Sequence, residues 1–339
     1  MNTKQTVLEE LYRAAETGSF VSGQEFAEKA GLSRAAVWKA VTALRTEGVK
    51  IEAVPKLGYR LTESGSFLDA EIIRSRLPAD SGIKIRLLDI TDSTNSEADR
   101  IISAAKEISS VHKTTVIAGE QTAGRGRLGR KFYSPAATGL YISLIYVPGG
   151  SIQNPAVLTA TAAVAVCRAI KKIYGAECGI KWVNDIYLDG KKICGILTEG
   201  RMNFETGRIE AAIVGIGVNI TTACQNFPDG LGEKAGSILG ENGDARRNLL
   251  AAEIIREVFG IYDSAENGFQ DAIREYREKS VLKGKRIEIS PVVGTSKENY
   301  PATVIGITDD AGLEVRLDSG ETRVLHSGEI SLHGTNLFR

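Results

Sequence analysis

The chain has 339 residues, of which 42% are hydrophobic and 25% are charged, and its 42 basic residues balance its 42 acidic residues. This length exceeds what one hydrophobic core usually holds, so we expect two or three domains in a globular, cytoplasmic protein. No apolar run approaches the roughly 20 residues that a membrane span needs, and zero net charge excludes nucleic-acid binding by anything but a local patch.

Targeting and metal-site signals are not evident in the sequence. The first ten residues lack the apolar centre and cleavage site of a signal peptide, so none is expected. The four cysteines are scattered without C-x-x-C spacing, which is typical of free thiols in a reducing compartment. None of the three histidines lies near a cysteine in sequence, so we expect no structural metal site.

The first sixty residues predict a winged helix-turn-helix. Apolar residues at helical spacing indicate a helix from Val7 to Glu16, and Ser22 is placed to cap a second, short helix. The tight turn Gly31-Leu32-Ser33 leads into a third helix, from Arg34 to about Glu47. Residues 51–61 then predict two short strands that form the wing.

Positive charge concentrates on the third helix and the wing. Between Arg34 and Arg60 six basic residues face only two acidic ones, Glu47 and Glu52. Such a patch on the element that enters the major groove favours DNA binding. The alternative is a winged helix used for protein contacts, and Trp38 could equally belong to the core. The DNA-binding candidates are Ser22, Ser33, Arg34, Trp38, Lys39, Arg45, Lys56 and Arg60.

A composition shift at residues 62–66 marks a linker, and residues 67–280 predict a mixed α+β domain. Its first helix is expected from Leu68 to Leu77, with Asp69 in the first turn, where the helix dipole favours an acid. A strand follows at residues 83–88, because its apolar residues alternate.

A polar cluster, Ser93-Thr94-Asn95, follows that strand, and we call it the head-group cluster. One interpretation is a helix N-cap, since these residue types favour that position. The other is functional, because hydroxyl and amide groups beside a strand end can hydrogen-bond a small polar head group. The residues alone leave both interpretations open.

Glycines and arginines alternate from Gln121 to Arg130, a stretch that we call the Gly/Arg loop. It matches G-x-G-x-x-G formally, but no helix opens on its last glycine and no acidic residue follows about 20 positions on, which excludes a dinucleotide-binding turn. The P-loop ending in Gly-Lys-Ser/Thr is also missing from the sequence.

The composition of the Gly/Arg loop favours an anionic ligand. Its glycines let the backbone approach a ligand closely, and guanidinium groups match carboxylate and phosphate geometry. No Asp or Glu occurs between Glu120 and Glu177, so we expect the positive charge of the loop to be unneutralised. The alternative is an ordinary exposed basic loop.

The next elements are a strand at residues 140–147 and a long helix. Asn154 is placed as the N-cap of this helix, Pro155 at its first position and Gly175 as its stop.

The run Lys181-Trp182-Val183-Asn184-Asp185 opens a predicted hairpin, because Asp189-Gly190 favours a tight turn between two β-rich runs. The hairpin would bring Asp185 and Lys192 to the same end of a sheet, either for chemistry or as a structural ion pair. A further strand at residues 213–220 places the amide of Asn219 at its end.

The remaining part of the chain predicts a loop, two helices and a small barrel. Residues 224–243 are rich in Gly, Asp and Asn and are expected to form a mobile loop, followed by helices at 248–263 and 268–279. Short strands with close turns between them suggest a barrel, and they cover residues 285–289, 302–307, 313–317 and 322–325.

Together these motifs resemble those of the biotin–protein ligases. The Gly/Arg loop and the head-group cluster match that family, as does the Lys181–Asp185 run, although Val183 replaces the usual proline. The run Gly215-x-Gly217-x-Asn219 also matches. The resemblance implies an α+β protein with a winged helix-turn-helix (1–66), a mixed-sheet, class II synthetase-like ligase domain (67–280) and an SH3-like C-terminal domain (281–339).

The resemblance implies a bifunctional enzyme and biotin-responsive repressor. Biotin and ATP, with Mg2+ on the phosphates, would give biotinyl-5′-adenylate, and biotin would pass to a lysine of a biotin carboxyl carrier protein, such as that of acetyl-CoA carboxylase. Ligand would promote a homodimer that binds palindromic operator DNA.

The resemblance also assigns residues by role. The catalytic candidates are Arg125, Arg127, Lys192 and Asp185, the last for orienting the acceptor amine. The biotin-binding candidates are Ser93, Thr94, Asn95, Gln121, Gly124, Arg125, Gly126, Arg127 and Lys192. The nucleotide-binding candidates are Arg127, Asn184 and Asn219.

Two rival functions remain open. A lipoate–protein ligase shares the adenylate chemistry, but the Gly/Arg loop and the Lys-Trp-x-Asn-Asp run favour the biotin branch. A non-catalytic biotin sensor would lose the charge of Lys192 or Arg127, and both are present. The sequence therefore favours the enzyme.

Overall fold

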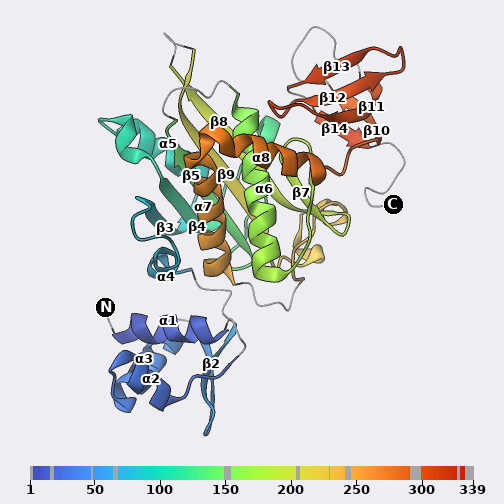
Figure 1. The fold of residues 1–339 in the computed structure, drawn as a ribbon. Coiled ribbons are helices and arrows are strands. Elements are labelled where there is room, and N and C mark those ends of the chain that lie inside the picture. Colours follow the sequence, from blue (N-terminus) through green and yellow to red (C-terminus); the bar gives the residue numbers. More distant parts are fainter. Residues whose placement is uncertain are drawn as a thin grey trace.

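The computed structural model describes residues 3–15, 19–46, 49–63, 68–148, 154–203, 207–228, 230–240, 246–290, 299–326 and 329–332. These residues form an N-terminal helical unit with a wing, a central seven-stranded sheet with helices, and a C-terminal five-stranded sheet (Figure 1). Several sequence predictions lie outside the described residues: Glu16 and Glu47 at helix ends, residues 64–66 of the linker, and residues 229 and 241–243 of the expected loop.

The N-terminal unit is the predicted winged helix-turn-helix. Its elements are α1 (Thr3–Ala15), α2 (Gly23–Ala30), α3 (Arg34–Thr46) and the antiparallel strands β1 (Lys50–Val54) and β2 (Gly58–Glu63). Ser22 caps α2 in a capping box with Glu25, and Gly31 ends this helix at a positive φ of 65°. Ser33 Oγ accepts a hydrogen bond from the backbone N–H of Ala36 at 3.2 Å, which caps α3 as predicted.

The core of this unit leaves one large aromatic side chain outside. Phe26, Val37, Val41 and Leu44 are buried in one cluster, whereas 60% of Trp38 is exposed. The alternative that Trp38 belongs to the core is therefore wrong.

The central sheet has the strand order β3-β4-β5-β9-β8-β7-β6. Neighbouring strands are antiparallel except for β3 and β4, which are parallel. The bounds are β3 (Lys84–Thr91), β4 (Thr114–Gln121), β5 (Gly139–Tyr146), β6 (Gly179–Lys181), β7 (Asp185–Leu188), β8 (Lys191–Met202) and β9 (Ile209–Asn219).

Helices cover both faces of this sheet. On one face lie α6 (Pro155–Tyr174), α7 (Arg247–Asp263) and α8 (Ala265–Glu278), and on the other lies α5 (Thr94–Ala104) (Figure 1). Alternate residues of a strand therefore enter different cores, as Val116 packs on the α5 side and Ile117 on the α6 side. Asn154 caps α6 and Gly175 ends it, as predicted.

Several element boundaries differ from the sequence prediction. The helix α4 (Ala70–Ser75) is shorter than expected, because Asp69 is its N-cap and accepts from the backbone N–H of Glu71 at 2.8 Å. Helix α8 begins at Ala265 instead of Gly268, close behind α7.

The C-terminal residues form the sheet β13-β12-β11-β10-β14, which is antiparallel throughout. Its strands are β10 (Arg286–Ser290), β11 (Tyr300–Ile307), β12 (Leu313–Leu317), β13 (Thr322–Leu325) and β14 (Glu329–Leu332). It docks on the central domain where the indole N–H of Trp182 donates to the carbonyl of Ala311 at 2.9 Å and Arg277 Nε donates to that of Ile307 at 2.7 Å.

The start of α7 joins the N-terminal unit to the central sheet. Asn248 Nδ2 donates to the hydroxyl of Tyr12 on α1 at 2.8 Å, and Asn248 Oδ1 accepts from the backbone N–H of Asp69 at 2.8 Å. The neighbouring Arg247 is 1% exposed and its Nε donates to the carbonyl of Gly139 at 2.7 Å. Burial lowers the pKa of Arg247 to about 10.

Candidate active site

The head-group cluster lies at the start of α5 and is buried, with at most 4% of each residue exposed. Ser93 stands at the N-cap position, yet its side chain makes no capping hydrogen bond. The N-cap interpretation is therefore wrong for the Ser93 hydroxyl. Ser93 lines a cleft together with Gln121, Phe132 and Gly217.

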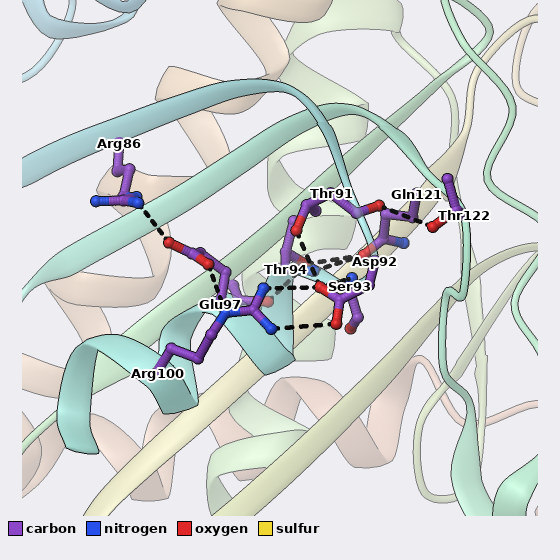
Figure 2. A network of polar contacts seen from close by, with 10 residues as sticks. Arg86, Thr91, Asp92, Ser93, Thr94, Glu97, Arg100, Gln121 and Thr122 are labelled. Carbon is purple, nitrogen blue, oxygen red and sulfur yellow. Dashed lines mark hydrogen bonds and ion pairs between the residues drawn. The ribbon is translucent and has the colours of Figure 1, made fainter. Parts of the chain in front are cut away.

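An ionic network holds the backbone in front of the cluster (Figure 2). Asp92 Oδ1 accepts from the backbone N–H of Ser93 at 2.7 Å and from Arg100 Nη2 at 2.8 Å. Hydrogen bonding to Arg100, helped by that N–H, holds the pKa of Asp92 well below its ordinary value. Arg100 also binds Glu97, which in turn pairs with Arg86.

The same segment anchors the first residues after β4. The N–H of Thr122 donates to the carbonyl of Thr91 at 2.9 Å, and the N–H of Ala123 donates to that of Asp92 at 2.8 Å. The start of the Gly/Arg loop is thus tied to the residues that precede the head-group cluster (Figure 2).

Gln121 lines the cleft, and two buried serines, Ser134 and Ser143, hold the lining residues by hydrogen bonds. Gln121 Oε1 accepts from the N–H and hydroxyl of Thr94 at 2.8 and 3.1 Å, and Gln121 Nε2 donates to Ser134 Oγ at 2.8 Å. Ser143 Oγ of β5 lies 2.7 Å from Thr94 Oγ1 and 2.5 Å from Asn95 Oδ1. Sequence reasoning missed Ser134 and Ser143, because neither belongs to a local motif.

The Gly/Arg loop folds back on itself. The N–H of Phe132 donates to the carbonyl of Gly124 at 2.8 Å, and the N–H of Gly126 donates to that of Arg130 at 2.7 Å. The chain reverses at Leu128 and Gly129, both with positive φ. Gly124 is needed here, since a Cβ would lie 2.4 Å from the carbonyl oxygen of Phe132.

Two arginines of the loop bind different partners. Arg125 Nη2 lies 2.9 Å from Glu199 Oε2 on β8, beside the head-group cluster. Arg127 Nη1 donates to Asn184 Oδ1 at 3.2 Å, and Asn184 directly precedes Asp185 in the chain. The expectation that the loop's charge is unneutralised is therefore wrong for Arg125, because its partner comes from a strand 74 residues further on.

Two paired strands form the floor of the cleft. Gly195 pairs with Gly217 and Leu197 with Gly215 across β8 and β9. The ring of Phe132 lies over this floor, since a Cβ on Gly217 would be 2.5 Å from the ring. The paired glycines therefore leave room for an aromatic side chain and a ligand, and Phe132 is another lining residue that the sequence motifs did not indicate.

The second polar centre is the ion pair of Lys192 and Asp185. The two charged groups lie 2.6 Å apart, with 33% and 21% of their side chains exposed. The hairpin turn at Asp189-Gly190, both with positive φ, brings them together as predicted. The backbone of Lys192 is also hydrogen-bonded to the segment 234–236, since its N–H donates to the carbonyl of Lys234 at 2.9 Å.

Two asparagines flank this ion pair. The amide of Asn184 donates to the carbonyl of Ile196 at 3.0 Å, which turns its oxygen toward Arg127. Asn219 Nδ2 donates to the carbonyl of Gly236 at 3.1 Å, while its buried oxygen has no hydrogen-bond partner among the described residues. A buried acceptor without a partner is a candidate for binding a ligand.

The described residues contain neither a metal cluster nor a membrane-spanning helix. Among them there is no group of three His, Cys, Asp or Glu side chains that could hold a metal ion. The four cysteines are free, as predicted. Over the described part of the chain, no helix combines the length and apolar character that crossing a membrane requires.

The DNA-binding candidates lie on α3, on the wing and at the caps of α2 and α3, and Arg34 Nη2 donates to Gln24 Oε1 at 3.2 Å. Arg34, Trp38 and Lys39 are exposed on α3. Arg45 and Arg60 have structural partners, the carbonyl of Ile51 and the carboxylate of Glu52. Lys56 lies exposed in the turn between the two wing strands.

Comparison with known sequences finds two families. Residues 87–219 match the biotin/lipoate A/B protein ligase family, and residues 4–60 match an HTH domain. The bifunctional ligase/repressor BirA of Bacillus subtilis (strain 168) is 32% identical over 337 residues, which cover 98% of this chain and 99% of the relative. The Escherichia coli (strain K12) protein of the same name is 33% identical over 257 residues, covering 75% of each chain.

Comparison with solved structures supports the fold. Biotin protein ligase from Aquifex aeolicus, solved in complex with biotin and ATP, superposes with a TM-score of 0.60 at 23% identity and covers 74% of this chain and 99% of that one. At this identity the likeness establishes a shared fold.

Proposed function

The chain belongs to the family of bifunctional BirA ligase/repressors, and we propose that it joins biotin to carrier proteins with ATP and represses transcription when biotin is plentiful. The relatives that share its whole length carry both activities in their names. One observation carries the catalytic half: the Gly/Arg loop sends Arg125 to the head-group cluster and Arg127 to Asn184 beside the Lys192–Asp185 pair. A single loop thus spans a polar-head site and a charged site.

In the first half-reaction, the carboxylate of biotin attacks the α-phosphorus of ATP, which gives biotinyl-5′-adenylate and pyrophosphate. Two anions must meet, so the protein contributes chiefly positioning and positive charge. Arg127 and Lys192 supply that charge beside Asn184, and Asn184 and the unpaired oxygen of Asn219 orient the nucleotide.

The opposite end of the cleft binds the ureido ring of biotin. Ser93 and Thr94 bring hydroxyls, Asn95 an amide oxygen and Gln121 an amide group, and all four residues line the cleft. Gly124 and Gly126 let the loop backbone close over the ligand, with Arg125 at the ureido end.

Mg2+ is part of this proposal. It keeps several waters and usually binds through substrate phosphates with one or two carboxylates, where it neutralises phosphate charge. Mg2+ would be held chiefly through the phosphates of ATP, next to the Lys192–Asp185 pair at the charged end of the site.

In the second half-reaction, a lysine of a biotin carboxyl carrier domain, such as that of acetyl-CoA carboxylase, attacks the adenylate. We assign Asp185 to orienting that amine, since it already holds an ammonium group at 2.6 Å. Lys192 then retains the adenylate phosphate.

The repressor half rests on the winged helix. Exposed Arg34, Trp38 and Lys39 on α3 suit the major groove. We propose that bound adenylate promotes a homodimer, whose two-fold symmetry matches a palindromic operator. We also propose that the C-terminal sheet closes into an SH3-like barrel and that the protein works in the cytoplasm.

The deciding experiment is biotin-dependent release of pyrophosphate from ATP, with and without an apo-carrier domain. We expect release with biotin alone and covalent biotin on the carrier when it is added. Labelled biotin is then competed with lipoate, and preference for lipoate would move the chain to the other branch of its ligase family. Binding of biotin without pyrophosphate release would identify a sensor. DNA footprints that do not depend on biotinyl-adenylate would refute the proposal that the protein is a biotin-responsive repressor.

A further inference from the structure

A carboxylate at the head-group end of the cleft has no part in the function proposed so far. Glu199 lies on β8, and its Oε2 accepts from two groups: Asn95 Nδ2 at 2.6 Å and Arg125 Nη2 at 2.9 Å. One oxygen atom thereby joins a residue of the head-group cluster to a residue of the Gly/Arg loop.

The two neighbours of the Asn95 amide determine which way it faces. Asn95 Nδ2 lies 2.6 Å from Glu199 Oε2 and 3.2 Å from the carbonyl oxygen of Leu197. Carboxylate and carbonyl oxygens only accept hydrogen bonds, so both amide hydrogens of Asn95 must point at them. A ligand therefore finds no donor at Asn95 and can use only Oδ1.

The surroundings of that oxygen fit this orientation. Asn95 Oδ1 accepts from Ser143 Oγ at 2.5 Å, which leaves its second lone pair. Room for the oxygen comes from Gly215 on β9, where a Cβ would lie 2.1 Å from Asn95 Oδ1. The floor of the cleft and Glu199 thus hold the amide in one orientation.

We propose that Glu199 is a positioning residue that fixes Asn95 as a hydrogen-bond acceptor for a ureido N–H of biotin and draws Arg125 of the Gly/Arg loop to the same end. This inference rests on the proposed biotin-binding function. It makes Glu199 a determinant of selectivity for ligands with an N–H donor at that point. It also links recognition of the ureido ring to closure of the loop, since Asn95 and Arg125 share one carboxylate oxygen.

The test compares Glu199→Ala and the isosteric Glu199→Gln with the control Glu210→Gln, which changes an exposed carboxylate on the neighbouring strand β9. The ligands are biotin, biotin methylated at either ureido nitrogen, and desthiobiotin, which keeps the ureido ring but lacks the sulfur. Binding is measured by calorimetry and turnover by pyrophosphate release.

For the wild type we expect methylation at one of the two nitrogens to weaken binding by about tenfold or more, the effect of losing one well-placed hydrogen bond. In Glu199→Ala the KM for biotin should rise about tenfold or more while the KM for ATP stays within about threefold, because the charged end is untouched. The ratio of biotin to methylated-biotin affinity should fall toward one, whereas the ratio of biotin to desthiobiotin should not change.

A merely structural role would weaken all ligands equally and lower the melting temperature, so an unchanged methylation ratio in both Glu199 variants overturns the proposal. Equal binding of biotin and both methylated forms by the wild type overturns it as well, even if neither variant folds. A double-mutant cycle with Arg125→Ala should show coupling, and strict additivity would refute the link to the loop. If the wild type releases no biotin-dependent pyrophosphate, the proposed function fails instead.

Discussion

Replacing Lys192 with Met should abolish most adenylate formation while leaving the fold intact. A unit charge about 4 Å from its partner is worth about 4 kcal/mol at an effective dielectric constant near 20. The side chain of Lys192 is 33% exposed, so solvent screens part of this. About 3 to 4 kcal/mol of lost transition-state stabilisation corresponds to a rate lower by about 100- to 1,000-fold.

The assay is single-turnover formation of biotinyl-adenylate at saturating biotin and ATP. Lys234→Met is the matched control, because Lys234 is exposed and its backbone carbonyl, which the substitution keeps, accepts from the N–H of Lys192. Thermal unfolding is measured alongside, because the buried Asp185 Oδ1 loses its cation in this variant. A rate for Lys192→Met within about threefold of wild type would refute the assigned role of this charge.

Three further outcomes are expected. Ser93→Ala should raise the KM for biotin about tenfold. The free energy of unfolding should not fall by the roughly 1 kcal/mol that loss of a helix cap costs, because the Ser93 side chain makes no capping hydrogen bond. A lower melting temperature with an unchanged KM would contradict this prediction. Trp38→Ala should weaken operator binding without destabilising the protein, since 60% of the residue is exposed, and equal footprints for both proteins would rule out the contact. Burial lowers the pKa of His112, whose Nδ1 accepts from the N–H of Val147 at 3.1 Å. The neutral imidazole therefore stabilises the fold fully above the unfolded pKa of about 6.5, and this stabilisation is lost as pH falls through the lower folded pKa. His112→Gln should flatten that part of the curve of unfolding free energy against pH, and an unchanged curve would contradict the prediction.

The candidate site shows which features a sequence can reveal. The head-group cluster, the Gly/Arg loop and the hairpin with Asp185 and Lys192 were predictable because each is contiguous or joined by a recognisable turn. Glu199 and Ser143 were not, because the pairing of β8, β9 and β5 brings them to Asn95, and no local pattern specifies that pairing.

Local rules also failed where two favourable assignments competed. Asp69 suits a first helical turn as well as an N-cap, and only the structure shows that it caps α4. The Ser93 hydroxyl suits a cap equally well, yet the neighbouring Asp92 holds the backbone N–H of Ser93 instead. In both cases residue preference predicted a helix start near the right position but not which hydrogen bond the side chain makes.

Because side chains of a β-strand alternate between its two faces, the pairing of β8 with β9 determines both which residues face the cleft and which enter the core. Gly195, Leu197 and Glu199 share one face of β8, while Cys194 and Ile196 on the other face enter the core beneath α6. Inserting a single residue within either strand would exchange these two sets, so apolar side chains would fill the cleft and a carboxylate would enter the core. A shift inside the ladder would therefore cost ligand binding and folding together.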